Sequence, residues 1–558
     1  MKRHECFTVL GKPFFSVGGQ LHNSSSYALG AAGGEKYMQD MATSFASIKA
    51  LGANTVAVPV CWDALEPEEG VFDCDYVKRI IERTRENGLH AVLLWFGTWK
   101  NGQMEYTPAW VKRDKKRFKR ALLPDGRETA VMSPFYEENR EQDKRAFCKL
   151  MEIVKECDEQ HGTVIAVQVE NEPGGLAAAM RDFSEKGTEA FEGPVPATMI
   201  EAAKKDNGRV GTYWKKNGCR ESGSWAEVFG YFGAELCYAW GVATYIDDIA
   251  FAGKQIYDIF MYVNVWTDRN GVKGFSMAGL DYPAGGAVSK VLPAWYAATP
   301  HLDAICPDIY DGEAEGIRLA QSNYDNIENG YPLYVPESGM TKINATLMFE
   351  AVGKHQAIGY HIFAAESALD ENGNLQEGVS CIRRSFDMLC NASDLILKYR
   401  GTDKMFTLTQ NLGQDSQRLE VDDWMCRVSY AGASADFAGW VAMDYRHGKD
   451  LVNINHVPSS LSEETARGLL FRVDDNEYYL VGHKVRLYWQ KMDRNDGSIP
   501  GNMMNLEHQA YNMELLKIEE GHFENGEYVV DKVRSGDEAR HGIWAQADCG
   551  VIHFVLGE

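Results

Sequence analysis

The chain has 558 residues, of which 45% are hydrophobic and 11% aromatic, and its 57 Lys and Arg against 80 Asp and Glu give a formal net charge of −23. This composition is typical of a globular protein with two or three domains and excludes an intrinsically disordered chain. The negative charge argues against binding nucleic acid or an anionic membrane by general electrostatic attraction, and it favours neutral partners such as sugars.

The N-terminus and the cysteines predict the compartment. Residues 1–6 lack the continuous apolar stretch of a secretory signal, and no run of eighteen apolar residues predicts a membrane span. The 12 cysteines are scattered singly from Cys6 to Cys549, without CxxC pairs, which is typical of reduced thiols rather than of a disulfide framework. We therefore expect a cytoplasmic protein.

Short apolar runs alternate with helical patterns over the first four hundred residues, which indicates parallel βα architecture. Residues 75–87, for example, place five apolar or small side chains on one helical face before Gly88. Eight such units predict an α/β fold, a (β/α)₈ TIM barrel over residues 1–400. The predicted strands are residues 15–19, 55–60, 90–95, 163–170, 260–266, 304–309, 333–336 and 357–363.

Two connections are too long for plain barrel loops, and the last part of the chain has a different pattern. Residues 97–162 and 174–259 follow the third and fourth strands, where barrel enzymes build their sites, and predict lids or binding walls. Residues 404–558 show closely spaced strand patterns, including a hairpin of 469–473 with 478–481. They predict an antiparallel all-β, sandwich-like domain that binds sugar, forms an interface or packs against the barrel.

Carboxylates stand at the ends of two predicted strands. The fourth strand ends in Glu170, Asn171 and Glu172 before Pro-Gly, and the seventh delivers Glu337 into a turn of small residues. Strands on opposite sides of a barrel can aim two side chains across one pocket, so Glu172 and Glu337 are the predicted pair. Such a pair serves glycoside hydrolysis, in which one carboxyl protonates the leaving oxygen and the other attacks the sugar or activates water.

Further polar and aromatic residues cluster at the same predicted mouth. Aromatic faces stack on sugar rings, and amides, His and Lys bind hydroxyl groups. The candidates are Gln20, His22, Trp62, Trp95, Trp99, Lys100, Asn264, Trp266 and Tyr310, and Asp308 ends the sixth strand beside them. The sequence shows no HExxH, no His-x-x-x-His pair and no dinucleotide fingerprint, so neither a metal nor an organic cofactor is expected.

Three segments carry a resemblance to known enzymes. Residues 62–73 resemble the Trp-x-x-x-Glu-Pro-x-x-Gly-x-Phe-Asp segment of glycoside hydrolase families 35 and 42. Residues 168–172, Gln-Val-Glu-Asn-Glu, are similar to the family 35 acid/base motif, and residues 95–102 resemble a bacterial branch with a β-rich C-terminal domain. The resemblance implies a clan A barrel, a retaining double displacement and no cofactor.

The resemblance also implies roles for individual residues. Glu172 would be the acid/base, Asn171 would hold the sugar 2-hydroxyl, Glu337 would be the nucleophile and Tyr310 would hydrogen-bond it. His22 matches a histidine near the sugar, and Glu66 would be structural. The chain departs from family 35 at Pro173-Gly174 and in the loop after strand three, where Phe-Gly-Thr-Trp replaces a Cys-Ala-Glu-Trp type of segment.

Several functions stay open on the sequence alone. The leading prediction is an exo-acting retaining β-galactosidase whose partner is a β-linked glycoside or oligosaccharide. A β-glucosidase or β-glucosyltransferase is the alternative, because the altered strand-three loop is part of the sugar site in relatives. A non-catalytic glycan-binding protein is the rival from another class, and it would not need both glutamates. A homo-oligomer is possible for any of them.

Overall fold

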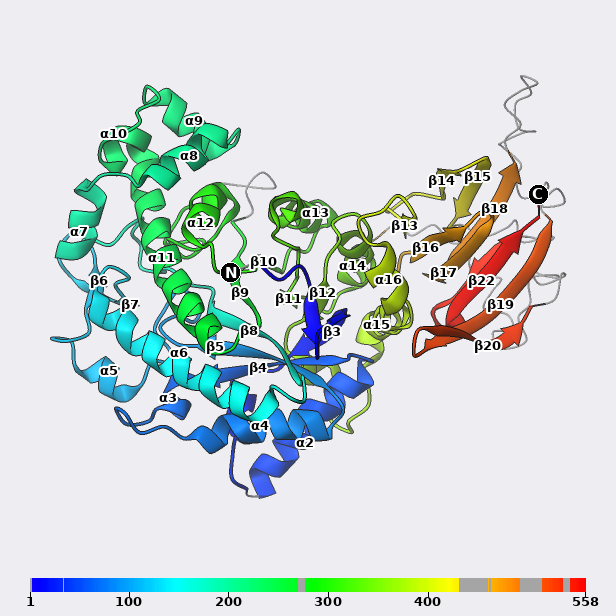
Figure 1. Cartoon of the computed structure of the whole chain (residues 1–558), viewed down its shortest axis with the longest axis horizontal. Helices are drawn as coiled ribbons and strands as arrows, with labels where there is room; N and C mark the ends of the chain where they lie inside the picture. The colour runs from blue at the N-terminus through cyan, green and yellow to red at the C-terminus, as the bar shows by residue number, and fades with distance from the viewer. Residues whose placement is uncertain are drawn as a thin grey trace.

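The computed structural model describes residues 3–33, 35–268, 276–430, 460, 463–491, 514–534 and 542–557. Eight parallel strands form a barrel in which each strand pairs with its neighbour in sequence, so the predicted TIM barrel is confirmed (Figure 1). In chain order the strands are β3 (Ser16–Gln20), β4 (Thr55–Cys61), β5 (His90–Phe96), β8 (Val164–Asn171), β9 (Phe260–Trp266), β10 (Ala304–Ile309), β11 (Glu337–Ser338) and β12 (Gly359–Ile362).

The barrel closes between β11 and β12. Val335 forms a parallel bridge with Tyr360, and the backbone N–H of His361 donates to the carbonyl of Val335 at 2.8 Å. The seventh strand was predicted at 333–336, whereas the ladder with β10 runs over Glu337–Ser338. Pro336 has no N–H to donate, so the ladder resumes only after it.

Helices cover the outside of the barrel, and their apolar faces pack on the strands. In α4, the five buried residues are those that the sequence pattern predicts, and Asp73 caps the helix by accepting from the N–H of Tyr76 at 3.0 Å. The covering helices are α2 (Glu35–Ala50), α4 (Cys74–Glu86), α6 (Glu137–Asp158), α11 (Gly233–Ile256), α12 (Leu292–Ala298), α13 (Ala314–Tyr324), α14 (Lys342–Gly353), α15 (Ser380–Asn391) and α16 (Ser393–Tyr399).

The amino end of the barrel is plugged by a short hairpin of β1 (Phe7–Val9) and β2 (Lys12–Phe14). The ring of Phe7 lies edge-on to Phe260 and Tyr334, with ring centroids 4.8 and 5.0 Å apart. Because this end is filled by apolar side chains, the opposite, carboxyl end is the face left for a site.

The two long connections do contain extra structure at the carboxyl end. They hold α5 (Ala109–Arg113), β6 (Arg120–Leu122), β7 (Glu128–Met132), α7 (Glu185–Glu192), α8 (Ala197–Lys205), α9 (Arg209–Lys216) and α10 (Trp225–Phe229). The buried carboxylate of Asp182 joins them, because it accepts from the N–H of Leu122 at 2.9 Å and from the hydroxyl of Ser133 at 2.5 Å. Together they build a wall, and α7–α10 form a lobe beside the barrel (Figure 1).

Two antiparallel sheets follow the barrel, as predicted, and enclose a core of their own. The predicted hairpin is formed by β16 and β17, and Asn476 takes a left-handed conformation in its turn. One sheet has the order β13 (Met405–Thr409), β16 (Arg467–Asp474), β17 (Glu477–His483), β22 (Val551–Leu556), β19 (Leu515–Glu524), β20 (Glu527–Val533). The other has the order β14 (Ser416–Val421), β15 (Trp424–Ser429), β18 (Val485–Lys491), β21 (Ile543–Ala545).

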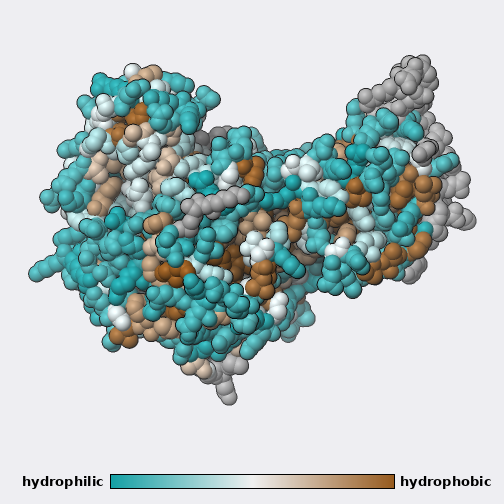
Figure 2. All heavy atoms as spheres, viewed as in Figure 1, coloured by the Kyte–Doolittle hydropathy of each residue, from teal (hydrophilic) through white to brown (hydrophobic). Residues whose placement is uncertain are grey.

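The surface is mostly hydrophilic, with apolar side chains gathered in a few places (Figure 2). Leu516, Val529, Val530 and Val533 are exposed on the β19–β20 hairpin, at the edge of the six-stranded sheet. No helix in the described ranges is long and apolar enough to cross a membrane. All 12 cysteines lie in these ranges, and each is a free thiol.

Candidate active site

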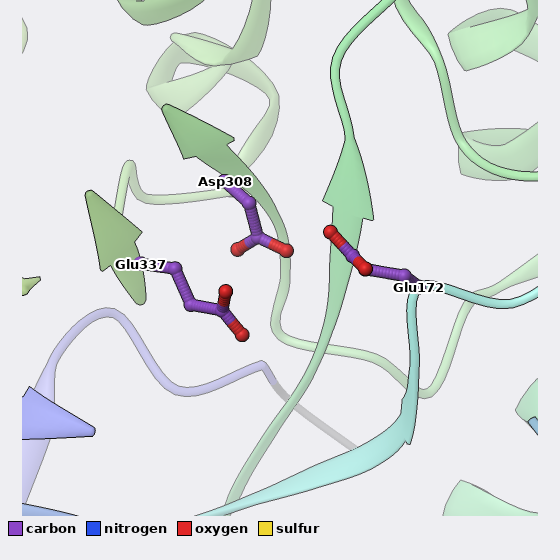
Figure 3. Close-up of side chains that lie close together, drawn as sticks. All are labelled: Glu172, Asp308 and Glu337. Carbon is purple, nitrogen blue, oxygen red and sulfur yellow. The ribbon is translucent and has the colours of Figure 1, made fainter. Parts of the chain in front are cut away.

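Three carboxyl groups meet at the carboxyl end of the barrel. Glu172 follows β8, Asp308 lies near the end of β10 and Glu337 begins β11. Figure 3 shows the three side chains converging, and one carboxyl oxygen of each lies within 4.8 Å of those of the other two. All three residues are buried, with 9% of Glu172, 2% of Asp308 and 4% of Glu337 exposed.

A β-bulge at the end of β8 decides which acid of the Glu170-Asn171-Glu172 motif enters this cluster. The register against β9 shifts between Gln168 and Asn171, and Glu170 takes a left-handed conformation with φ of 64°. The carboxylate of Glu170 consequently accepts from the backbone N–H groups of Thr98 and Trp99, at 3.0 and 2.6 Å, and holds the loop after β5. A bulge of this kind re-aims the following side chain, and here that side chain is Glu172.

Asn264, at the end of β9, links the members of the cluster. Its side-chain oxygen accepts from the N–H of Glu172 at 3.0 Å, and its Nδ2 donates to Asp308 Oδ2 at 2.7 Å and to Glu337 Oε1 at 3.3 Å. The hydroxyl of Tyr310 donates to Glu337 Oε2 at 2.7 Å. Both oxygens of Glu337 thus have a hydrogen-bond donor.

The electrostatics of the other two carboxyls differ from those of an exposed acid. Burial raises the pKa of Glu172 to about 7, and the negative charge of Glu337 adds to the shift while Lys100 opposes it. Burial, and then the charges of Glu337 and Glu172, raises the pKa of Asp308 well above its ordinary value. The arrangement therefore holds a proton donor near neutral pH beside a hydrogen-bonded carboxylate, which is the equipment of acid/base and nucleophilic catalysis.

Asn171 and Lys100 form the polar edge of the site on the side of the long loops. The ammonium of Lys100 donates to the side-chain oxygens of Asn171 and Asn101, at 2.8 and 2.7 Å. The Nδ2 of Asn171 is buried, and no hydrogen-bond acceptor of the described residues reaches it. Since a buried amide donor without an acceptor is costly, this group is available for a ligand oxygen.

Three of the aromatic side chains predicted to stack on the sugar lie in the core and not at the mouth of the barrel. Trp62, Trp95 and Trp99 are at most 1% exposed and belong to the core between barrel and helices, so their faces are not presented at the mouth. Trp62 Nε1 donates to Glu66 at 2.9 Å and Trp95 Nε1 donates to Asp143 at 2.8 Å. The predicted stacking role is therefore wrong for these rings in this structure, because each follows or ends a strand but points outward from it.

Other predicted residues do lie at the mouth. Trp266 ends β9 and is 38% exposed. His22, which contacts Ser367 through Nε2 at 3.0 Å, and Tyr310 flank the ring of Phe363, with ring centroids 6.1 and 6.3 Å away. These rings and Trp266 are aromatic side chains at the carboxyl ends of barrel strands that are not fully buried.

Two glutamines of the barrel strands carry unused hydrogen-bonding capacity. Gln20 at the end of β3 and Gln168 in β8 are fully buried, and both amide atoms of each have no partner among the described residues. Gln20 is a predicted site residue, whereas Gln168, Phe363 and the place of Asp308 in the carboxyl cluster were not assigned from the sequence. Asp308 and Phe363 both end predicted strands, and that position was the signal that could have found them.

Among the residues that the structure describes, Glu172, Asp308 and Glu337 are also close enough together to hold a divalent cation. However, Asn264 donates to Asp308 Oδ2 and Glu337 Oε1, and Tyr310 donates to Glu337 Oε2, so each of these oxygens already has a hydrogen-bond donor. The donor pattern therefore fits proton chemistry better than metal binding.

Two family models match parts of the chain. Residues 35–218 match the family model of glycoside hydrolase family 42, described as beta-galactosidase, and residues 382–546 match a domain of unknown function, DUF5597. The first match includes Glu172 and ends before Glu337. The match to family 42 supports the assignment of a β-glycosidase. The resemblance to family 42 is thereby supported, and the resemblance to family 35 stays a prediction.

Solved structures give distant similarities. The catalytic domain of β-amylase from Paenibacillus polymyxa has a TM-score of 0.45 at 13% identity, covering 66% of this chain and 96% of that one. Two β-galactosidases, from Rahnella sp. R3 and Marinomonas ef1, have TM-scores of 0.46 at 15% and 13% identity and cover 71% and 70% of this chain. The chain spans 58% and 61% of their lengths. Similarities this distant do not assign a substrate, and no curated protein matches the chain.

Proposed function

We propose that this protein is a retaining, exo-acting β-glycosidase that hydrolyses terminal β-galactosyl residues. The observation that carries the proposal is the pair of glutamates with opposite environments, Glu172 with a pKa of about 7 and Glu337 with a donor on each oxygen. Retaining enzymes place their two carboxyl groups about 5–5.5 Å apart, whereas inverting enzymes need about 6.5–9.5 Å to admit a water. One oxygen of Glu172 and one of Glu337 lie within 4.8 Å of each other, a proximity compatible with the retaining arrangement.

In this mechanism Glu337 attacks the anomeric carbon while Glu172 donates its proton to the glycosidic oxygen, and the aglycone leaves as an alcohol. A covalent glycosyl ester of Glu337 forms, and the negative charge of Glu337 disappears. Because that charge raises the pKa of Glu172, ester formation lowers the pKa. Glu172 can then accept a proton from the water that attacks the anomeric carbon, which breaks the bond from that carbon to Glu337, releases the sugar and restores both carboxyl groups.

The sugar is the part of the proposal that rests on the family 42 match, whose description is beta-galactosidase. Asn171 Nδ2 is the group that we assign to the sugar 2-hydroxyl, because it is buried and its hydrogen bond is unused.

The test compares wild type with Glu337→Gln on matched nitrophenyl β-galactoside, β-glucoside, β-xyloside, β-fucoside and α-L-arabinoside. The exposed Glu328→Gln is the matched control, since it makes the same chemical change nine residues earlier. We expect β-galactoside turnover in wild type and in the control, and loss of at least about 10³-fold in Glu337→Gln. A preference for β-glucoside would move the substrate to the alternative, and an active Glu337→Gln would remove Glu337 from the mechanism.

Stereochemistry gives a separate check. Nuclear magnetic resonance of the first product formed should show the β-anomer of the free sugar, whereas the α-anomer would indicate inversion. Glu172→Ala should be partly rescued by azide on a substrate with a good leaving group, giving a β-glycosyl azide. An α-glycosyl azide would instead mean that Glu337 does not form a covalent intermediate.

A further inference from the structure

The carboxyl cluster contains one more acid than a double displacement uses. Asp308 is 2% exposed, and its Oδ2 accepts from Asn264 Nδ2 at 2.7 Å. Its other oxygen, Oδ1, is buried and accepts no hydrogen bond from a donor of the described residues. An ionised carboxylate would leave that oxygen both desolvated and unpaired, which is costly in a buried site.

The position of Asp308 offers a partner for this oxygen. Figure 3 shows one oxygen of Asp308 directed toward the carboxyl of Glu172, and one carboxyl oxygen of each residue lies within 4.8 Å of the other. Two carboxyl groups can hydrogen-bond directly only when a proton lies between them, as in a pair of acids that share one proton. A proton between these two carboxyls would give Asp308 Oδ1 the hydrogen-bond partner that it otherwise lacks.

The charges that face the pair favour the same state. Glu337 lies across the cluster and has donors on both oxygens, Tyr310 contributes a neutral hydroxyl, and Lys100 is the cation whose charge acts on both Asp308 and Glu172. Three ionised carboxyls beside one ammonium would leave two uncompensated negative charges in a buried site. Holding a proton on Asp308 removes one of them.

We propose that Asp308 is a positioning residue that stays protonated, accepts from Asn264 through one oxygen and donates through the other to Glu172. In this role Asp308 orients the Glu172 carboxyl toward the glycosidic oxygen and stabilises the ionised form that Glu172 adopts after proton transfer. The inference rests on the proposed function for its catalytic meaning. The protonation state itself does not depend on which sugar is cleaved.

The substitutions Asp308→Asn and Asp308→Ala separate this role from its alternatives. An asparagine has one acceptor and one donor, as a protonated carboxyl has, so it can keep both hydrogen bonds, whereas alanine keeps neither. We expect Asp308→Asn to keep kcat/KM within about threefold of wild type, with the fall of activity at alkaline pH unmoved. For Asp308→Ala, loss of a hydrogen bond to a charged group should lower kcat/KM by about 10- to 100-fold, mainly through kcat.

The direction in which the alkaline fall of kcat/KM moves in the variants shows whether Asp308 is protonated or ionised. Removing a proton donor should raise the pKa of Glu172, so the alkaline fall of kcat/KM should move to higher pH in Asp308→Ala. An ionised Asp308 would repel the Glu172 carboxylate, and both variants would then move the fall to lower pH, which would overturn the proposal. It would equally fail if Asp308→Asn lost as much activity as Asp308→Ala, or if activity required added Mg²⁺ and disappeared in EDTA.

A measurement without substrate keeps the inference testable if the proposed function fails. The free energy of unfolding is measured from pH 5 to 9 for wild type, Asp308→Asn and Asp308→Ala, each with and without the additional change Glu172→Gln. In each background, the difference between the protein with Glu172 and the protein with Glu172→Gln reports the ionisation of Glu172 in the native protein. We expect the pH at which this difference changes to be the same in wild type and Asp308→Asn and higher in Asp308→Ala. A lower value in Asp308→Ala, or no change, would contradict a protonated Asp308. Silence of wild type on every glycoside would instead contradict the proposed function alone.

Discussion

Two glutamates separated by a single residue, Glu170 and Glu172, have different environments in this protein, and the backbone is the cause. Glu170 adopts a φ of 64° and Glu172 a φ of 44°, a left-handed conformation that costs of order 1 kcal/mol or more for a residue other than glycine. The result is that Glu170 turns to the backbone of the loop after β5, while Glu172 enters the carboxyl cluster. In the Glu170-Asn171-Glu172 motif, Glu170 therefore holds the loop beside the site, and Glu172 lies in the site itself.

The raised pKa of Glu172 predicts a pH dependence of activity. As the acid, Glu172 must be protonated in the free enzyme, so kcat/KM should fall as the pH rises through about 7. The measurement is kcat/KM on a nitrophenyl glycoside from pH 4 to 9. A profile that stays flat from pH 6 to 9 would contradict the assignment of Glu172 as the acid.

The same pKa predicts that Glu172 lowers stability in alkaline solution. The native pKa of about 7 lies above the ordinary value of 4.5, so the two states differ in protonation only between these values, and stability falls as the pH rises across that interval. Above about pH 7 the full difference corresponds to about 3 kcal/mol. Glu172→Gln should therefore raise the free energy of unfolding at pH 8 and have little effect at pH 4. An equal effect at both pH values would point to packing instead.

At the scale of elements, the site depends on the hydrogen bonds between the end of β8 and the loop after β5. Both oxygens of Glu170 accept backbone N–H groups of that loop, and Gly102 N–H in turn donates to the carbonyl of Glu172 at 2.9 Å. The loop therefore reaches from the bulge to the acid itself. Lys100, which holds Asn171, lies on the same loop.

Glu170→Gln tests these hydrogen bonds. A glutamine offers one carbonyl oxygen in place of two carboxylate oxygens, so one of the N–H groups of Thr98 and Trp99 loses its acceptor. We expect a loss of about 1–3 kcal/mol in the free energy of unfolding and a lower kcat/KM, although Glu172 and Glu337 are unchanged. The exposed Glu185→Gln on α7 is the control. Wild-type stability and activity in Glu170→Gln would show that the loop holds its place without this residue.

At the scale of the whole molecule, a buried ionic network joins the barrel to the all-β part. Arg467 of β16 is fully buried and donates to Ser385 Oγ and the carbonyl of Cys381 in α15, at 2.6 and 2.9 Å. It also pairs with Glu464 at 2.8 Å, and Arg384 of α15 pairs with Glu464 at 2.6 Å. Burial opposes ionisation of Glu464, but hydrogen bonds and charges from His483 and Arg467 outweigh it and hold the pKa of that carboxyl well below its ordinary value.

Glu464→Gln should loosen this junction. It leaves the buried guanidinium of Arg467 without its anion, and breaking a buried pair from one side costs about 3–5 kcal/mol. Calorimetry should show a lower unfolding temperature, or separate transitions for the two parts. The same change at the exposed Glu371 should have no effect. Because the depressed pKa of Glu464 stabilises the folded state above the ordinary pKa, this difference should shrink as the pH falls below about 4.

Much of the fold follows from local patterns. Residues 75–87 predict α4 because the helical period places its five buried residues on one face, and the predicted hairpin of 469–473 with 478–481 is formed by β16 and β17. The seventh strand is displaced because Pro336 interrupts the ladder, an effect that depends on which neighbour the strand pairs with. Trp62, Trp95 and Trp99 were misplaced for a related reason, since the side of a strand end from which a ring projects depends on local backbone geometry that composition does not show.

By itself the sequence determined the parallel barrel, the antiparallel part after it, and the strand ends that carry Glu172, Asp308 and Glu337, since periodicity and residue type are local properties. Only the tertiary structure decided that Glu170 turns away, that Asp308 joins the two glutamates and that Asn264 connects all three. The physical reason is that burial, a bulge in the register and hydrogen bonds between distant strands determine direction and protonation, and these arise only when the strands are side by side.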